Sequence, residues 1–382
     1  MIVFREKLKG DLKRIIKDPT VFKDPLTVFN DIPYREDILE QVAVYIKSFV
    51  KAGTKFSVLF LGLTGTGKTF VAKFVMREIE KVKKEDRDYT SVVQAYVNCK
   101  EMGGNKGAVL HSLATQISKR DIPRRGLGTA DYIKFMKDYM KNKKAIMYLD
   151  EIDALVKKKD GDDVLYQLLR VDAPLSVIMI SNDLNVREGM DPRVLSSLGP
   201  TILFNPYDAQ QLSNILVRYA KAGLNVWDME IINYIAAIAA SEHGDARKAV
   251  ELLFRAAMVA SREGSDKIEK RHVDIAYQEY EREKVVEAVK DLPVHYKLVL
   301  MSVLKDNIAV NSYQIYKQIA EEMGVRVISY RRYAEILNEL EMFGLLKIRV
   351  ENFGRRGGIK KIVDVIDREK LEKIISSSVF ME

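Results

Sequence analysis

The chain has 382 residues, of which 47% are hydrophobic and 30% are charged, a composition that excludes an intrinsically disordered chain and suggests two or three folded domains. Its net charge of +8 favours an acidic partner such as nucleic acid, although the excess is modest for this length. The single cysteine, Cys99, excludes an intramolecular disulfide and a cysteine-rich zinc cluster, which indicates a reducing compartment. No run approaches the roughly 18 apolar residues that span a bilayer, and the N-terminus lacks the apolar core of a secretory signal, so we expect a cytoplasmic protein.

The first half of the chain has the pattern of an α/β domain. Residues 1–26 are basic and amphipathic, and they predict an N-terminal arm or a short helix. From residue 27 to residue 207, helical patterns alternate with five short apolar runs, which is typical of a parallel sheet covered by helices on both faces. The five runs are residues 56–63, 92–99, 145–150, 176–181 and 201–206.

The second half predicts two smaller domains. Residues 208–287 contain four amphipathic helical stretches separated by glycines, which predicts a helical domain. Residues 288–382 contain three further helical stretches, followed by strand patterns at 345–350 and 359–366 that are joined by a segment rich in glycine and arginine. Three helices followed by a hairpin form the winged-helix variant of the helix-turn-helix, so we predict a winged helix at this end.

A phosphate-binding loop is predicted at residues 62–69, which read Gly-Leu-Thr-Gly-Thr-Gly-Lys-Thr between a strand and a helix. Glycines let backbone N–H groups surround phosphates at the helix N-terminus. We expect Lys68 to reach the β- and γ-phosphates of ATP and the Thr69 hydroxyl to bind Mg²⁺. The strand–loop–helix context disfavours the alternative, a glycine-rich turn with a chance Lys-Thr. The candidate nucleotide contacts in this segment are Gly62, Thr64, Gly65, Thr66, Gly67, Lys68, Thr69 and Phe70.

Polar residues also follow two of the other predicted strands. The run 145–150 ends in Asp150, a candidate Mg²⁺ ligand, and is followed by Glu151, a candidate for orienting or deprotonating the attacking water. The run 176–181 leads to Asn182, which could position that water, although an ordinary turn explains this asparagine equally well. The Asp-Glu pair favours hydrolysis over nucleotide binding alone.

These features together resemble the AAA+ ATPases, in which a P-loop α/β domain is followed by an α-helical lid. The resemblance implies that Asn182 is the residue known as sensor 1. It also implies that Arg247, in Gly-Asp-Ala-Arg at 244–247, is sensor 2 and contacts the γ-phosphate from the lid. Without the resemblance, Arg247 would be read as a surface charge of the lid.

A closer resemblance, to the archaeal origin-recognition and cell-division-control initiators, rests on five motifs in the expected order. With the winged helix it covers nearly the whole chain. It implies a slow, Mg²⁺-dependent ATPase that uses ATP and ADP as a conformational switch. It also implies a nucleoid-associated protein that binds double-stranded origin DNA and helps to load the replicative helicase, with a paralogous initiator as a candidate partner. The motifs are Pro-Tyr-Arg-Glu at 33–36, Leu-Asp-Glu-Ile-Asp at 149–153, Ser-Asn-Asp at 181–183, Asp-Pro-Arg-Val-Leu-Ser-Ser-Leu at 191–198 and Gly-Asp-Ala-Arg at 244–247.

Several residues receive a role from this resemblance alone. Arg193 matches an arginine finger or phosphate-sensing arginine, although an arginine after Asp-Pro could equally cap a helix or pair with a surface acid. Residues 105–131 match a helical insertion that touches DNA, with the basic residues Lys119, Arg120, Arg124 and Arg125. The candidates for the remaining nucleotide contacts, the first three of them on the adenine side, are Pro33, Tyr34, Arg35 and Tyr207.

The third helix of the predicted winged helix carries the main candidates for DNA contact. Its first turn presents Tyr330, Arg331 and Arg332, in the part of a recognition helix that enters the major groove. We expect its Ile336, Leu340 and Phe343 to pack on the other helices. The wing tip carries Arg355 and Arg356, which suit contact with the minor groove or with phosphates. The alternative for such a domain is contact with another protein.

The alternative function is a STAND-type signalling ATPase that acts as a winged-helix transcription regulator or a defence protein. Such proteins share the P-loop, the acidic strand end, the lid and the winged helix. They usually lack the motifs found here at 33–36 and 191–198, so the replication initiator is the favoured hypothesis.

Overall fold

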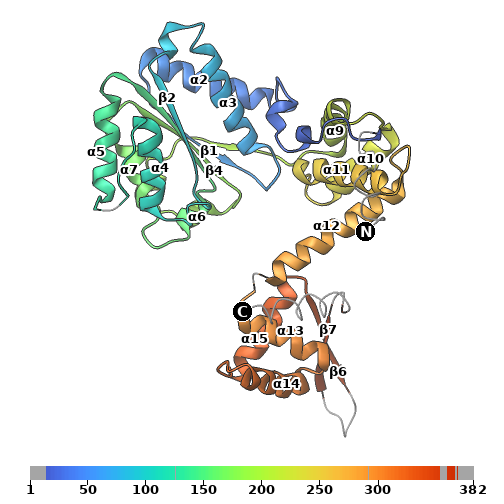
Figure 1. Cartoon of the computed structure of the whole chain (residues 1–382). Helices are drawn as coiled ribbons and strands as arrows, with labels where there is room; N and C mark the ends of the chain where they lie inside the picture. The colour runs from blue at the N-terminus through green and yellow to red at the C-terminus, as the bar shows by residue number, and fades with distance from the viewer. Residues whose placement is uncertain (1–13, 125, 291, 353–358, 366–367, 369–382) are drawn as a thin grey trace. The chain divides into compact units, whose positions relative to one another are not determined.

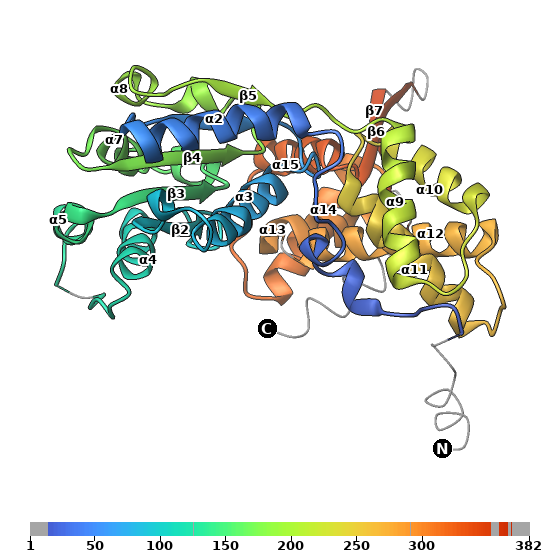
Figure 2. The ribbon, with the colours of Figure 1, turned by 90° about the horizontal axis from the view of Figure 1, so that it is seen from above.

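The computed structural model describes residues 14–124, 126–290, 292–352, 359–365 and 368. The chain divides into two compact units, residues 1–275 and 276–382. Figures 1 and 2 show the elements of each unit from two directions. In the described part of the chain, no helix is long and apolar enough to cross a membrane.

The first unit is built on a five-stranded parallel sheet, which confirms the predicted α/β architecture. Each strand coincides with one of the five predicted apolar runs to within one residue at its start, and the last strand is shorter than its run. In sheet order the strands are β2 (Val92–Asn98), β3 (Lys144–Asp150), β4 (Leu175–Ser181), β1 (Ser57–Leu61) and β5 (Thr201–Leu203).

Helices cover both faces of the sheet. Successive side chains of a strand point to opposite faces, so each strand contributes to two cores. Val58 and Phe60 of β1 lie in the core shared with α2 and α3, whereas Leu59 and Leu61 lie in the opposite core with α4, α5 and α7. The short helices α6 and α8 follow β3 and β4. These helices are α2 (Glu36–Ala52), α3 (Lys68–Val82), α4 (Lys106–Ser118), α5 (Thr129–Tyr139), α6 (Asp153–Val156), α7 (Asp163–Arg170) and α8 (Pro192–Leu195).

The predicted DNA-binding insertion, residues 105–131, consists of α4, the loop that follows it and the start of α5. Val109, Leu110 and Leu113 of α4 are buried in the sheet core, so this helix is part of the sheet-covering layer. Among the described basic residues of the segment, Lys119, Arg120 and Arg124 of the loop after α4 are exposed.

The helical lid follows β5 within the first unit, as α9 (Ala209–Gly223), α10 (Met229–Ser241) and α11 (Ala246–Arg262). Each helix starts at an aspartate whose carboxylate accepts backbone N–H groups of the first turn, which satisfies donors that a helix start leaves unpaired. These caps are Asp208, Asp228 and Asp245. The next helix, α12 (Lys270–Lys290), continues across the boundary between the two units.

Residues 14–29 form an N-terminal strap that packs on the lid and reaches α3. The Lys17 N–H donates to the Gly223 carbonyl over 2.8 Å, and Ile16 forms an isolated β-bridge with Leu224. At the other end of the strap, the Arg77 guanidinium donates to the carbonyls of Leu26 and Phe29, over 2.9 and 3.1 Å. The segment expected as an arm or short helix therefore contains, from residue 14 on, two short 3₁₀ turns that are docked on the domain.

The second unit has the predicted winged-helix topology. Its helices are α13 (Val294–Lys305), α14 (Ala309–Glu322) and α15 (Tyr330–Met342), followed by the antiparallel pair β6 (Leu346–Asn352) and β7 (Ile359–Val365). Ile336 and Leu340 are buried as expected, but the expectation for Phe343 is wrong, because its side chain is 59% exposed. Phe343 follows the last residue of α15 and precedes Gly344 at φ +71°, so the helical period no longer sets its direction.

The strap should contribute to the stability of the lid. Ile15 is fully buried, so Ile15→Ala is expected to lower the free energy of unfolding by about 2–4 kcal/mol. Urea titration followed by the fluorescence of Trp227, the single tryptophan, which lies between α9 and α10, would measure this.

Val44→Ala is the matched control, because this side chain on α2 is 65% exposed and its loss should cost less than about 0.5 kcal/mol. A loss below about 1 kcal/mol for Ile15→Ala would mean that the strap does not support the lid.

Candidate nucleotide and DNA-binding sites

The P-loop connects β1 to α3, and its backbone requires glycine at two positions. Gly65 and Gly67 have φ of +77° and +95°, a region that other residues rarely adopt. A Cβ atom on Gly65 would lie 1.8 Å from the Asp245 carboxylate, and one on Gly67 would lie 2.8 Å from the Tyr207 hydroxyl. The loop therefore has the open backbone that a phosphate cradle needs, and the lid residue Asp245 lies directly against it.

Lys68 is buried at the start of α3, and its ammonium donates to the carbonyls of Gly62 and Leu63, over 2.8 and 2.7 Å. Burial lowers the pKa of this lysine to about 8, the nearby Asp150 carboxylate opposes the shift, and the Arg247 cation adds to it. Two positive groups, one from the P-loop and one from the lid, are thus close enough to repel each other. A polyphosphate anion would relieve that repulsion, so the residues present fit such a ligand.

Asp150 lies at the carboxyl end of β3 and is almost fully buried. Its Oδ2 atom accepts from the Thr69 hydroxyl and from the Tyr96 hydroxyl, each over 2.7 Å, and its Oδ1 atom accepts from the Glu151 N–H. The pairing of Thr69 with Asp150 brings together the two predicted Mg²⁺ ligands. A hydroxyl and a carboxylate are oxygen ligands of the type that Mg²⁺ prefers, so the donor set fits this ion.

Tyr96 was missed by the sequence reasoning. It lies on β2, next to β3 in the sheet, and burial together with the Asp150 carboxylate raises its pKa, so the hydroxyl stays protonated and donates. The only signal in the sequence is a tyrosine two residues before the end of the strand. Its partner is decided by strand register, which the sequence does not show.

Glu151 and Asn182 follow neighbouring strands, β3 and β4, at the same edge of the sheet. Since β4 lies between β3 and β1, Asn182 follows the strand between the P-loop strand and the acidic strand. Both side chains are half-buried, and neither has a hydrogen-bond partner within the described ranges. Glu151 has φ of +52°, a strained conformation of the kind that concentrates at functional sites.

The start of α11 is bonded to the P-loop, which brings the sensor 2 candidate to the site. The Ala246 N–H donates to the Gly65 carbonyl over 3.3 Å, and Asp245 caps the helix by accepting from the Arg247 N–H over 2.8 Å. The Arg247 side chain is exposed and its Nε atom lies 3.9 Å from the Asp245 carboxylate.

The segment before α2 forms another side of the site. Pro33 is buried, and Tyr34 has φ of +64° and accepts a hydrogen bond from the Asn214 amide of the lid. The Arg35 guanidinium is buried and donates to backbone carbonyls of the P-loop and of the segment after β5.

The Phe70 ring, on α3, packs edge-on against Phe29 of the strap, with 5.8 Å between ring centroids.

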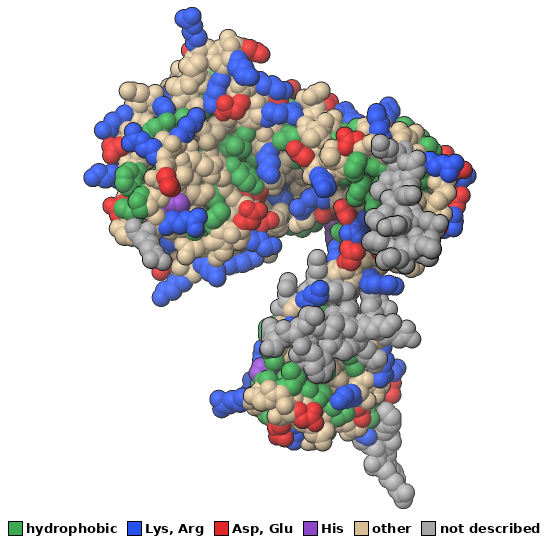
Figure 3. Space-filling view, viewed as in Figure 1, with side chains coloured by type: hydrophobic (Ala, Val, Ile, Leu, Met, Phe, Trp, Pro, Cys, Tyr) green, Lys and Arg blue, Asp and Glu red, His purple; other side chains and the backbone are tan. Residues whose placement is uncertain are grey.

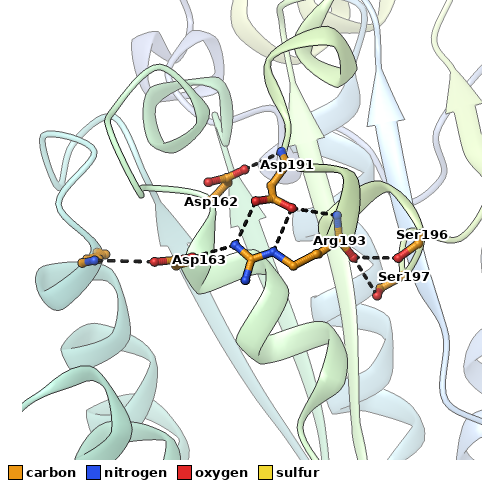
Figure 4. Close-up of polar contacts among 7 residues, drawn as sticks. Asp162, Asp163, Asp191, Arg193, Ser196 and Ser197 are labelled. Carbon is orange, nitrogen blue, oxygen red and sulfur yellow. Dashed lines mark hydrogen bonds and ion pairs between the residues drawn. The ribbon is translucent and has the colours of Figure 1, made fainter.

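Arg193, on α8, is held by surface acids (Figure 4). Its guanidinium donates twice to the Asp191 carboxylate, over 2.9 and 2.8 Å, and lies 3.7 Å from Asp163. This pairing lowers the pKa of Asp191 to about 2. This geometry matches the alternative in which the arginine pairs with a surface acid. Among the described residues, Arg193 forms no hydrogen bond or ion pair with the other predicted nucleotide contacts.

The candidate DNA contacts differ in how strongly they are tied to the protein. Arg331 is 91% exposed, and its Nε atom lies 3.3 Å from Glu335. Arg332 donates to Glu335, Glu339 and the Tyr296 hydroxyl, so its charge is largely neutralised. Tyr330 is also exposed.

The basic loop after α4 is the second candidate DNA contact. Lys119, Arg120 and Arg124 are exposed there, and on the face of the first unit seen in Figure 3 basic and acidic side chains are interspersed. Three of the predicted DNA contacts, Arg125, Arg355 and Arg356, lie outside the described residues.

Three family models match the chain. Residues 58–195 match the ATPase family associated with various cellular activities (AAA), residues 213–278 match the Cdc6 AAA+ ATPase-type lid domain, and residues 287–373 match the CDC6 C-terminal winged helix domain.

Similar proteins align with nearly the whole chain. ORC1-type DNA replication protein 3 of Sulfurisphaera tokodaii is 54% identical over 98% of this chain and 97% of its own length. The protein of the same name from Saccharolobus solfataricus is 54% identical over 99% of this chain and 96% of its own length. The solved structure of the Aeropyrum pernix ORC1 protein in complex with DNA is 34% identical, covers 96% of this chain and 98% of that chain, and has a TM-score of 0.79.

The contact between the P-loop and the lid can be tested with Gly65→Ala. The new methyl group would collide with Asp245, so we expect the lid to shift and nucleotide affinity to fall by about tenfold or more, a loss of about 1.4 kcal/mol or more in binding free energy. Titration with a fluorescent ATP analogue would measure the affinity.

Gly53→Ala is the matched control, because Gly53 has a similar φ of +73° but no atom within 4 Å of its Cβ position. Both variants carry the same backbone strain, so wild-type nucleotide affinity in Gly65→Ala would show that the contact with Asp245 is unimportant.

Proposed function

The chain belongs to the family of archaeal ORC1-type, Cdc6-related DNA replication proteins, and we propose that it is an ATP-switched initiator that binds double-stranded DNA at a replication origin. The observation that carries the proposal is the joint between α11 and the P-loop, where Ala246 is bonded to Gly65 and Arg247 lies within electrostatic reach of Lys68. A lid that shares the phosphate site with the P-loop can respond to which nucleotide is bound.

The P-loop backbone and Lys68 hold the phosphates in this proposal, and Thr69 and Asp150 hold Mg²⁺. Bound Mg²⁺ would supply positive charge at the phosphate oxygens. Tyr96 fixes the Asp150 carboxylate by donating to the same oxygen as Thr69. Glu151 accepts the proton of the attacking water and Asn182 orients that water, a division of roles supported by their two half-buried side chains at one sheet edge.

ATP hydrolysis is proposed to be slow and Mg²⁺-dependent. Its role in this proposal is to switch the protein between an ATP-bound and an ADP-bound state. Arg247 is the residue of the lid that would distinguish the two nucleotides, because its side chain is exposed and its charge acts on Lys68. Pro33, Tyr34 and Tyr207 are proposed contacts on the remaining sides. The role of Arg193 as an arginine finger would require it to leave Asp191.

DNA binding is proposed for two surfaces, the first turn of α15 with the wing and the basic loop after α4. The DNA complex of the A. pernix relative supports DNA as the partner. The replicative helicase and a paralogous initiator are further proposed partners. The transcription-regulator alternative is not favoured, since the relatives at 54% identity over nearly the full length are replication proteins. Occupancy of promoters alone, in a genome-wide binding profile, would reverse that preference.

Glu151→Gln tests the hydrolytic role. The amide keeps the size of the side chain but cannot take a proton, so turnover should fall by about 100-fold or more while ATP still binds. Phosphate release and nucleotide titration on the same preparation would separate the two effects.

The control is Glu188→Gln, an exposed acid in the 3₁₀ turn after β4, which should leave both quantities unchanged. Hydrolysis at the original rate by Glu151→Gln would remove Glu151 from the mechanism.

Arg331 and Arg332 form a matched pair for the DNA surface. Arg331→Ala should weaken duplex binding and reduce the slope of log K against log salt by about 0.9, the amount expected for one lost phosphate contact. Arg332→Ala should have a smaller effect, because Glu335 and Glu339 already neutralise this arginine. Fluorescence anisotropy at several salt concentrations would give both values, and the reverse ranking would contradict the assignment.

A further inference from the structure

Arg35 is a buried cation whose hydrogen-bond partners are all uncharged. Its residue exposure is 6%, and within the described part of the chain no carboxylate lies in ion-pair distance of its guanidinium. A charged group without a counter-ion is costly to bury, and it is stable only when its donors are satisfied. A structural role alone could be filled at lower cost by a neutral side chain, so the charge itself calls for an explanation.

The guanidinium joins three segments that are far apart in the sequence. Its Nε and Nη2 atoms donate to the Thr66 carbonyl of the P-loop, over 3.2 and 3.0 Å. Nη2 also donates to the Asn205 carbonyl, over 2.6 Å, and Nη1 donates to the Tyr34 carbonyl, over 2.9 Å. Three carbonyls in these directions match the planar fork of an arginine, whereas the ammonium of a lysine is a compact charge at the end of one stem.

The same group is fixed to the chain that leads into the lid. It lies over the Tyr207 ring, 4.1 Å from the ring centroid, and the Tyr207 hydroxyl is close to Gly67 of the P-loop. The Tyr207 N–H donates to the Gly244 carbonyl over 3.4 Å, one residue before the cap of α11. Asn205 and Tyr207 are thus the linker between β5 and α9, and this linker contacts Arg35, the P-loop and the start of α11.

We propose that Arg35 is a positioning residue that couples the P-loop to the lid. Its fork holds the Thr66 carbonyl and the Asn205 carbonyl at a fixed spacing, so a movement of the lid linker is transmitted to the phosphate loop. Its charge, left without a carboxylate, adds positive potential beside a loop whose ligand is a polyanion. The inference rests on the proposed nucleotide site and assigns Arg35 no contact with the nucleotide.

Arg35→Lys separates the geometry from the charge, because it keeps the cation but cannot bridge all three carbonyls. ATP affinity should fall by about 10- to 100-fold, because the Thr66 carbonyl of the P-loop is no longer held by the fork. The ratio of ATP to ADP affinity should also move towards one, since the lid is no longer held to the P-loop. Hydrogen exchange of the full-length chain should become faster at residues 64–67 and 205–208.

Arg218→Lys is the matched control. Arg218 also lies over an aromatic ring, that of Phe29, but it is at the surface and pairs with Asp31, so its replacement should change none of these quantities. If Arg35→Lys does not fold, Arg35→Gln, which keeps an amide donor but lacks the fork and the charge, should shift affinity and exchange in the same direction.

The outcomes separate this inference from the proposed function. Wild-type ATP and ADP affinities in Arg35→Lys overturn the coupling, including the case in which only the melting temperature falls, because that result describes a purely structural residue. A wild-type chain that binds neither nucleotide overturns the proposed function instead.

Discussion

The parallel register of three strands sets the position of the whole nucleotide site. β4 lies between β1 and β3, with Leu61 opposite Ser181 and Leu149 opposite Met179. Since the strands run in the same direction, their carboxyl ends meet at one edge, where the loops of such sheets usually carry the ligand site. The hydrogen bond between Thr69 and Asp150 joins the start of α3 to the end of β3 at this edge. The lid and the strap are arranged around a loop that the sheet has already placed.

The sheet, the P-loop and the acidic strand end could be predicted because each depends on a local pattern. A run of apolar residues predicts a buried strand, and a glycine-rich motif between a strand and a helix predicts a phosphate site wherever it occurs. Tyr96 and Arg35 could not be assigned in this way. Tyr96 reaches Asp150 only through the pairing of β2 with β3, and Arg35 reaches carbonyls 31 and 170 residues away. Phe343 was misassigned because a helical period applies only as far as the helix extends.

Three arginines show how the surroundings decide the use of one side chain. Arg193 is bound by carboxylates at the surface, and Arg332 is shared among two glutamates and a tyrosine hydroxyl, so both are locally neutralised. Arg35 is surrounded by carbonyls and rings that satisfy its donors without cancelling its charge. Near a site for phosphates, only the third arrangement leaves a positive potential.

The N-terminal strap also has a consequence for how the chain folds during its synthesis. Ile15 and Ile16 are buried, and Ile16 is paired with Leu224, so its partner is made only after the entire sheet. At roughly 5–20 residues per second, the chain from residue 16 to residue 224 takes about 10 to 40 s to emerge from the ribosome. The sheet and its P-loop have that interval to fold, while Ile16 of the strap still lacks its partner in the lid. The lid is consequently the last part of the first unit to close, and the newly made α/β domain exists for a time without the helices that contact its P-loop.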